Sequence, residues 1–160
     1  MEIATNWKSL SSNLVKYIRL GHEYVTLVAQ SKADAHLQPY VQVAWMDDMR
    51  MLLEGVGSAF VNYDFSDQQI MKLKKLGFEP PNHFGEDFPN WTQFREGEGT
   101  EPNSVARLLI QTLREVYVDE FEDFEFEILL SAHVIGMFEA GYPHRLNLNK
   151  LRLELNMEHL

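Results

Sequence analysis

The sequence predicts an α+β fold in which helices pack on a twisted antiparallel sheet. Residues 40–57 read YVQVAWMDDMRMLLEGVG, and the side chains before the two aspartates alternate between the two faces of an extended chain. Alternation with a period of two is typical of strands, so we expect a hairpin with a two-residue turn at Asp47 and Asp48. Residues 7–18 and 105–116 instead repeat apolar side chains every three or four positions, which indicates amphipathic helices. A lone hairpin is only marginally stable in water, so further strands and these helices are expected to pack on it.

The N-terminal part of the chain is expected to supply one helix and one strand. Asn6 or Thr5 can cap the helix, and Gly21 is placed where a helix ends. Residues 23–29 read EYVTLVA, a composition rich in β-branched and aromatic side chains, which favours a strand. With the hairpin this strand gives a three-stranded antiparallel meander, and the helix covers one face of it.

The middle of the chain carries further helix signals and a fourth strand. Ser66 and Gln69 stand three residues apart and predict a capping box, so a short helix is expected from there to Gly77. Residues 91–95 are expected to form the fourth strand. A long helix is expected to begin near Pro102.

Two C-terminal segments are less determined by their patterns. Residues 119–138 fit a strand, with Phe124, Phe126 and Ile128 on one face, and they fit a helix equally well. Both alternatives stay open. Residues 146–160 slightly favour a final helix, because polar residues dilute the leucines and β-branched residues are absent.

Composition narrows the classes of function. The chain has 160 residues, which suits one domain, and 24 acidic against 14 basic residues give a net charge of −10. A surface this acidic repels nucleic acids and anionic membranes and favours basic partners. There are no cysteines, so disulfides and thiolate sites are excluded. The N-terminus lacks the pattern of a signal peptide and no apolar run is long enough to span a bilayer, so we expect a cytoplasmic protein.

No motif predicts catalysis, a metal or a cofactor. The six histidines are not spaced as local ligand pairs. The glycines of residues 55–58 lack the third glycine of a dinucleotide fingerprint, since Phe60 stands there. The acidic run of residues 119–127 has neither the glycine of a calcium loop nor the defined carboxylate separation of a hydrolase. We therefore expect a protein that is not an enzyme and has no cofactor.

Several short motifs occur together in one order along the chain. These motifs are Tyr40-Val41-Gln42, Leu76-Gly77-Phe78, Asn90-Trp91, Arg95-Glu96 and Thr112-Leu113-Arg114-Glu115-Val116. With these motifs the chain resembles the TY-Chap family of small bacterial domains, which are similar to type III secretion chaperones and to YbjN-like proteins. The resemblance covers residues 7–126.

The resemblance implies a secretion-chaperone-like α+β fold that is often a homodimer. It also implies binding of a peptide or a partly unfolded segment of a client protein, as a chaperone-like or adaptor protein without catalysis. A small-ligand sensor or regulator of the YbjN-like type is the alternative. We expect residues 1–127 to form the chaperone-like domain and residues 128–160 to be a C-terminal extension packed on it.

The expected site is a sheet face or edge that the helices leave part-apolar. Extended peptides are held on such surfaces, where backbone pairing gives affinity and side-chain pockets give selectivity. The same face could instead join two copies of the chain. The candidate partner-binding residues are Tyr40, Gln42, Trp45, Trp91 and Arg95.

Overall fold

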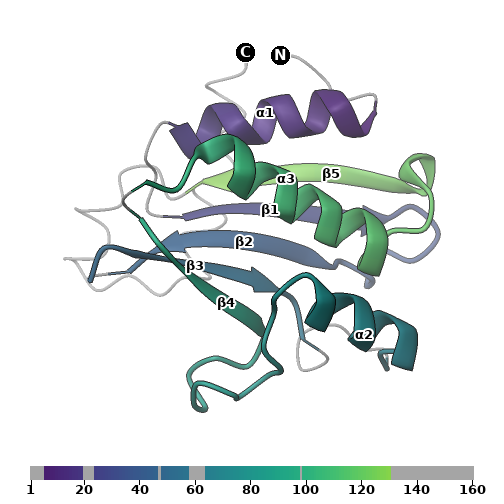
Figure 1. Ribbon diagram of the computed structural model, residues 1–160. Coiled ribbons are helices and arrows are strands. Elements are labelled where there is room, and N and C mark those ends of the chain that lie inside the picture. Colours follow the sequence, from purple (N-terminus) through teal and green to yellow (C-terminus); the bar gives the residue numbers. More distant parts are fainter. Residues whose placement is uncertain (1–5, 20–23, 47, 58–63, 98, 131–160) are drawn as a thin grey trace, which may run out of the picture.

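The computed structural model describes residues 6–19, 24–46, 48–57, 64–97 and 99–130. Within them the chain forms one five-stranded antiparallel sheet, with helices packed on it (Figure 1). The α+β fold expected from the sequence is confirmed. The elements in chain order are α1 (Trp7–Arg19), β1 (Tyr24–Ser31), β2 (Tyr40–Trp45), β3 (Arg50–Gly55), α2 (Asp67–Lys75), β4 (Trp91–Glu96), α3 (Pro102–Thr112), the π-helical turn η1 (Leu113–Tyr117), the 3-10 turn η2 (Phe121–Asp123) and β5 (Phe124–Leu130).

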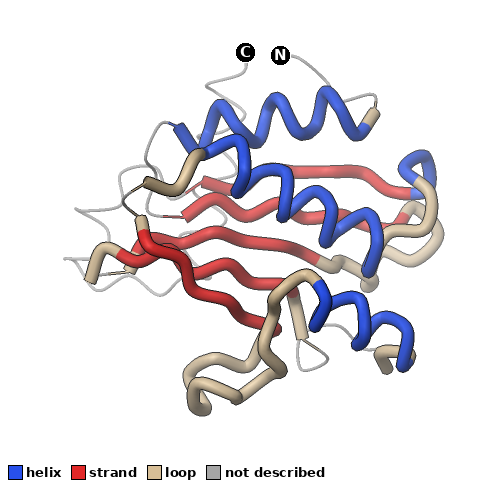
Figure 2. Tube along the Cα trace, in the orientation of Figure 1, coloured by secondary structure: helices blue, strands red, loops and turns tan. Residues whose placement is uncertain are grey.

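The strands lie in the order β4-β3-β2-β1-β5, so β4 and β5 are the two edges of the described sheet. Figure 2 shows α1 and α3 lying side by side across one face of it. We call this the helix face, and the opposite side the back face. The predicted meander of three strands is confirmed, and the fourth strand lies beside β3.

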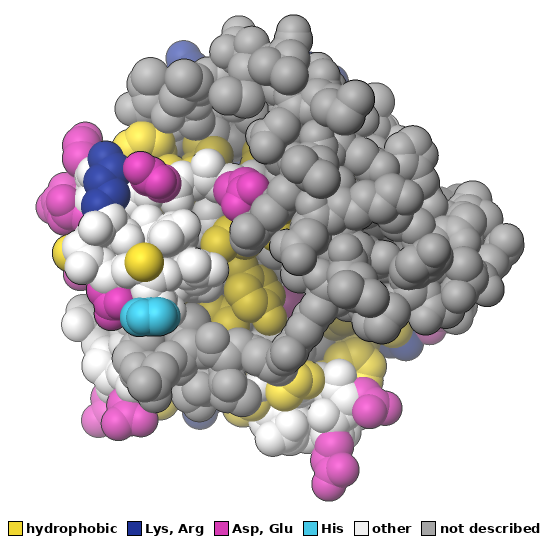
Figure 3. All heavy atoms as spheres, turned by 180° about the vertical axis from the view of Figure 1, so that it is seen from behind, with side chains coloured by type: hydrophobic (Ala, Val, Ile, Leu, Met, Phe, Trp, Pro, Cys, Tyr) yellow, Lys and Arg dark blue, Asp and Glu magenta, His cyan; other side chains and the backbone are white. Residues whose placement is uncertain are grey.

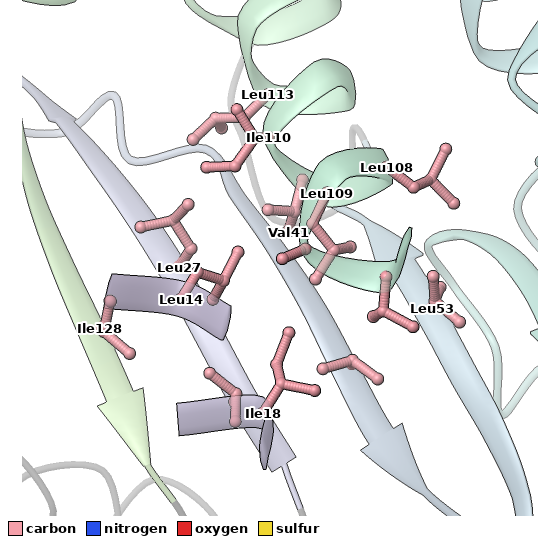
Figure 4. Close-up of a cluster of buried hydrophobic side chains, with 14 of the residues drawn as sticks. Leu14, Ile18, Leu27, Val41, Leu53, Leu108, Leu109, Ile110, Leu113 and Ile128 are labelled. Carbon is pink, nitrogen blue, oxygen red and sulfur yellow. The ribbon is translucent and has the colours of Figure 1, made fainter. Parts of the chain in front are cut away.

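The hydrophobic core fills the space between the helices and the helix face. Leu14 of α1 and Leu109 of α3 are fully buried, and they pack toward Leu27 of β1 and Val41 of β2 (Figure 4). Each such leucine stabilises the fold by about 1.5–3 kcal/mol through the apolar area removed from water. The helical spacing of apolar residues in the sequence therefore corresponds to the surface that each helix buries.

The hairpin is antiparallel as expected, but its register and its turn differ from the expected ones. Gln42 pairs with Glu54, whereas a two-residue turn at Asp47 and Asp48 would pair it with Leu53. The hydrogen bond nearest the turn joins the N–H of Met46 to the carbonyl of Arg50 (2.8 Å), so the turn is longer than the two residues expected. Met49 has the left-handed backbone (φ 68°), where an aspartate was expected. Asp48 instead accepts hydrogen bonds from the backbone N–H and the Nε of Arg50, at 3.1 and 2.6 Å.

The strand alternative is correct for β5. This strand pairs with β1 along its whole length, from Ser31 opposite Phe124 to Val25 opposite Leu130. It runs through the boundary that the sequence suggested at residues 127 and 128, so residues 128–130 belong to the sheet. Residues 131–160, with the expected final helix, lie outside the described part of the chain.

The capping box of α2 is present as expected. Ser66 Oγ accepts from the N–H of Gln69 (3.1 Å), and Gln69 Oε1 accepts from the N–H of Ser66 (2.9 Å). Gln69 also donates through Nε2 to the carbonyl of Val116 (2.7 Å), which ties α2 to η1. Gly77, with φ 98°, ends the helical segment, a conformation that favours glycine.

Candidate functional site

The back face carries a row of polar side chains that alternate with the core residues of the same strands. Thr26, Gln42, Glu54 and Thr92 stand opposite one another on four neighbouring strands. Their neighbours in sequence, such as Leu27, Val41 and Leu53, face the helices. The same alternation that builds the core therefore places a polar row behind it.

A chain of hydrogen bonds runs along this row. The hydroxyl of Thr26 donates to Gln42 Oε1 (2.5 Å), and Gln42 Nε2 donates to Glu54 Oε1 (3.2 Å). The other carboxylate oxygen of Glu54 accepts from Asn90 Nδ2 (3.0 Å), which also donates to the hydroxyl oxygen of Tyr40 (3.1 Å). The carboxylate of Glu54 thus receives one hydrogen bond on each oxygen.

The position of Asn90 is set by the backbone. The N–H of Gly57 donates to Asn90 Oδ1 (2.8 Å), so the amide oxygen faces Gly57 and the amide nitrogen faces Glu54. Asn90 is 5% exposed, and its three partners come from segments distant in sequence. This one side chain therefore joins the start of β4 to the ends of β2 and β3.

Burial changes the acidity of two groups in this network. It raises the pKa of the Glu54 carboxyl above its ordinary value, and the hydrogen bonds from Asn90 and Gln42 oppose that change. Burial also raises the pKa of the Tyr40 hydroxyl; the hydrogen bond from Asn90 opposes this rise and the charge of Glu54 adds to it. No lysine or arginine of the described residues forms an ion pair with Glu54.

Beside the polar row lies a group of aromatic rings, which we call the aromatic patch: Phe84, Phe88 and Phe94. The rings meet edge to face, with centroids 5.0 Å apart for Phe84 and Phe94 and 5.7 Å apart for Phe88 and Phe94. Phe88 and Phe94 are half-buried against Leu52, whereas Phe84 is 43% exposed. Figure 3 views the molecule from behind and shows hydrophobic side chains in the middle of this face.

The loop that presents Phe84 is held by its own backbone hydrogen bonds. Asn82 donates to the carbonyl of Phe88 (2.8 Å), and Gly85 donates to the carbonyl of Asn82 (3.1 Å). Phe88 in turn donates to the carbonyl of Gly85 (3.1 Å). The loop projects beyond the start of β4 in Figure 1. An exposed aromatic ring is therefore displayed on a folded loop and costs little ordering entropy when it binds.

An arginine already lies on this patch. The guanidinium of Arg50 is 4.4 Å from the centroid of the Phe94 ring, within the range of a cation–π contact. Its Nε lies 2.6 Å from Asp48 Oδ2. Hydrogen bonds from the backbone and the side chain of Arg50 lower the pKa of the Asp48 carboxyl. The back face thus accommodates a cation between a phenylalanine ring and a carboxylate.

The outer edge of β4 is only partly paired. Thr92 exchanges two backbone hydrogen bonds with Glu79, at 2.8 and 3.1 Å. Because alternate residues of a strand direct their peptide groups to the same side, the N–H and C=O of Phe94 also point outward. No other backbone group of the described residues bonds to them. The open edge therefore begins at Phe94, beside the aromatic patch.

The five candidate residues predicted from the sequence lie on two different faces of the sheet. Tyr40 and Gln42 lie on the back face and belong to the polar network. Trp45, Trp91 and Arg95 stand on strand positions that face the helix side. Trp91 is 4% exposed and packs in the core, with Phe65 6.4 Å from its ring. Trp45 and Arg95 are half-buried. Phe60 and Tyr63 lie outside the described residues.

Sequence reasoning missed Glu54 and the aromatic patch. The signal for Glu54 was present, since it is the one charged residue between Met51 and Gly57, on the same side of the hairpin as Gln42. No local pattern in the sequence predicts the aromatic patch. It forms because a loop outside any periodic segment folds back on β4.

Two other groups of residues considered in the sequence are the histidines and the acidic run. Among the residues that the structure describes, no group of three or more His, Asp or Glu side chains could hold a metal ion. The acidic run of residues 119–127 is divided between the turn η2 and the strand β5, where it lines an edge of the sheet. His22, His133, His144 and His159 lie outside the described residues.

Comparison with known proteins identifies the family. No curated protein and no solved structure matches the chain. Among the described residues, no helix combines the length and the apolar composition that a membrane span requires. A family model does match, over residues 1–119, and its description is "T3SS (YopN, CesT) and YbjN peptide-binding chaperone 3". This match spans most of the chain, and the chain therefore belongs to the TY-Chap3 family of peptide-binding chaperones.

Proposed function

We propose that this protein is a non-enzymatic chaperone-like or adaptor protein that holds an extended segment of a partner protein at the β4 edge. The observation that carries the proposal is that the exposed ring of Phe84 packs on the ring of Phe94, a residue of the edge strand β4 whose peptide group points outward. Membership of a peptide-binding chaperone family supports the same activity.

The two parts of this surface supply different kinds of binding energy. An extended segment that continues the pairing between Glu79 and Thr92 would form hydrogen bonds with the backbone of Phe94, which are independent of the client's sequence. The aromatic patch would cover alternate side chains of that segment, which selects apolar residues. Few groups need to rearrange, so the contact suits a transient complex.

Binding to a library of extended peptides, measured with the full chain, tests the proposal. Phe84→Ala removes a partly exposed ring and is expected to weaken peptide binding while it lowers the free energy of unfolding by only about 1 kcal/mol. Met71→Ala is the matched control, because Met71 is 69% exposed but lies on α2. The proposal fails if no peptide binds, or if the two variants weaken binding equally.

A homodimer and a cytoplasmic location belong to the same proposal, since both were expected from the sequence. Light scattering of the purified chain tests the first. The alternative function, a small-ligand sensor, remains a prediction from the sequence, and a thermal-shift screen against metabolites tests it.

A further inference from the structure

We infer that the aromatic patch selects client segments in which an apolar or aromatic residue is accompanied by arginine or lysine. This inference rests on the proposed function and specifies the chemistry of its partner. It concerns the exposed ring of Phe84 and the two carboxylates beside it in sequence, Glu86 and Asp87.

The first observation is the charge around the exposed ring. Residues 76–94 contain Glu79, Glu86 and Asp87 and no lysine or arginine. All three carboxylates are exposed, and those of Glu86 and Asp87 stand in the loop between Phe84 and Phe88. His83 contacts the Phe84 ring and lies 3.7 Å from the Glu79 carboxylate, so the carboxylates of this loop that form no ion pair among the described residues are those of Glu86 and Asp87. An apolar surface next to such carboxylates binds a cationic segment better than a neutral one, because opposite charges attract across the interface.

The second observation is independent of the first and concerns Arg50. Its guanidinium lies 4.4 Å from the ring centroid of Phe94 and is paired with Asp48, so the patch already stabilises a cation of this shape. Phe84 packs edge to face on Phe94 and keeps 43% of its own surface exposed. Glu86 and Asp87 follow Phe84 closely in sequence, so a ring and carboxylates are again neighbours in one loop. Among the described residues the His83 ring contacts Phe84 (4.8 Å between centroids), and no arginine or lysine lies over the Phe84 ring.

The two halves of the contact require different groups of the client. The Phe84 ring offers a hydrophobic surface and a negative ring face, which a guanidinium or ammonium group contacts favourably. The carboxylates offer acceptors that are hydrated until the client arrives, and their attraction weakens as salt rises. The preference for cationic clients is therefore expected to decrease as the salt concentration rises, whereas the affinity from apolar contact is expected to be independent of salt.

Three matched peptides test the inference with the full chain. Each alternates valine with threonine and carries one central phenylalanine, flanked by arginine, glutamine or glutamate. Fluorescence anisotropy at low and high salt gives their affinities. We expect the arginine peptide to bind about tenfold more tightly than the glutamine peptide at low salt, the glutamate peptide to bind most weakly, and high salt to reduce the differences.

Variants separate the local effect from the net charge of the protein. The double variant Glu86→Gln with Asp87→Asn is expected to abolish the preference for arginine while the glutamine peptide still binds. The control double variant, Glu120→Gln with Glu122→Gln, removes the same charge from exposed positions at η2 and is expected to keep the preference.

Each outcome bears on one claim. If all three peptides bind equally, or if the control pair abolishes the preference as well, the inference is overturned and the proposed function stands. If none binds to the wild-type chain, the proposed function at this surface fails with it. Phe84→Ala is expected to weaken the binding of all three peptides. If this variant binds them as tightly as the wild type does, the aromatic patch is not the binding site.

Discussion

The carboxylate of Glu54 accepts a hydrogen bond from the side-chain amide of Asn90 at 3.0 Å, and no cationic side chain of the described residues pairs with it. A buried carboxylate stabilised by neutral amides costs free energy when it ionises, because burial removes its hydration.

The first prediction concerns pH. Burial raises the pKa of Glu54, so the folded chain binds a proton that the unfolded chain has released. The contribution of this group to stability is therefore greatest below the ordinary glutamate pKa, and it decreases as pH rises toward the raised folded value. Urea unfolding between these two pKa values is expected to show that the free energy of unfolding of the wild type decreases as pH rises. The same measurement on Glu54→Gln is expected to show no such decrease.

Glu125→Gln is the control for this measurement, since Glu125 is an exposed glutamate of β5, the edge strand farther from Glu54. It is expected to keep the wild-type dependence. An unchanged dependence in Glu54→Gln would contradict the account of Glu54.

The second prediction concerns Asn90. Asn90→Ala leaves the N–H of Gly57 and one oxygen of Glu54 without their partner in a buried place, which is expected to lower the free energy of unfolding by about 3 kcal/mol. Asn103→Ala changes an exposed asparagine in the first turn of α3. Its free energy of unfolding is expected to differ from that of the wild type by less than about 0.5 kcal/mol. Chemical denaturation compares the two. Equal effects would mean that the network does not stabilise the fold.

The third prediction concerns the hairpin turn. Met49 has a φ of 68° and is 70% exposed, so its side chain strains the backbone without packing in return. Met49→Gly is expected to stabilise the protein by about 1 kcal/mol, because glycine adopts the left-handed region freely. Met71→Gly, at a similarly exposed position within α2, is expected to destabilise it by about 1 kcal/mol. Thermal unfolding of both variants measures the contrast, and a shift of the same sign in both would refute the explanation.

The fourth prediction distinguishes packing from partner binding at Trp91. The ring is 4% exposed in the core, so Trp91→Ala is expected to lower the free energy of unfolding by about 3–5 kcal/mol. Denaturant unfolding and peptide binding are measured on the same preparation. A variant that retains wild-type stability but loses peptide binding would instead place Trp91 at the client surface.

The parts of the fold that the sequence predicted correctly are those with a repeating or reciprocal local pattern. The alternation in β2 predicts which side chains face the core, and the Ser66–Gln69 capping box predicts the start of α2. Both signals act within a few residues. They do not depend on what the segment later packs against.

The parts that the sequence left open depend on tertiary contacts. Residues 124–130 fit a strand and a helix, and pairing with β1 decides between them. Trp91 and Phe84 are both aromatic residues near turns, yet one is buried and the other exposed. The difference arises from the loop before β4, whose left-handed residue Asn82 and internal hydrogen bonds have no periodic signature in the sequence.

The most direct test of the central claim is hydrogen exchange of the backbone amides, with and without the saturating arginine peptide. If a client segment is held at the β4 edge, the outward N–H groups of Phe94 and Glu96 exchange more slowly in the complex, and so do amides of the loop that carries Phe84. If the peptide binds and protection appears only on α1 and α3, the client is held elsewhere and the account is wrong.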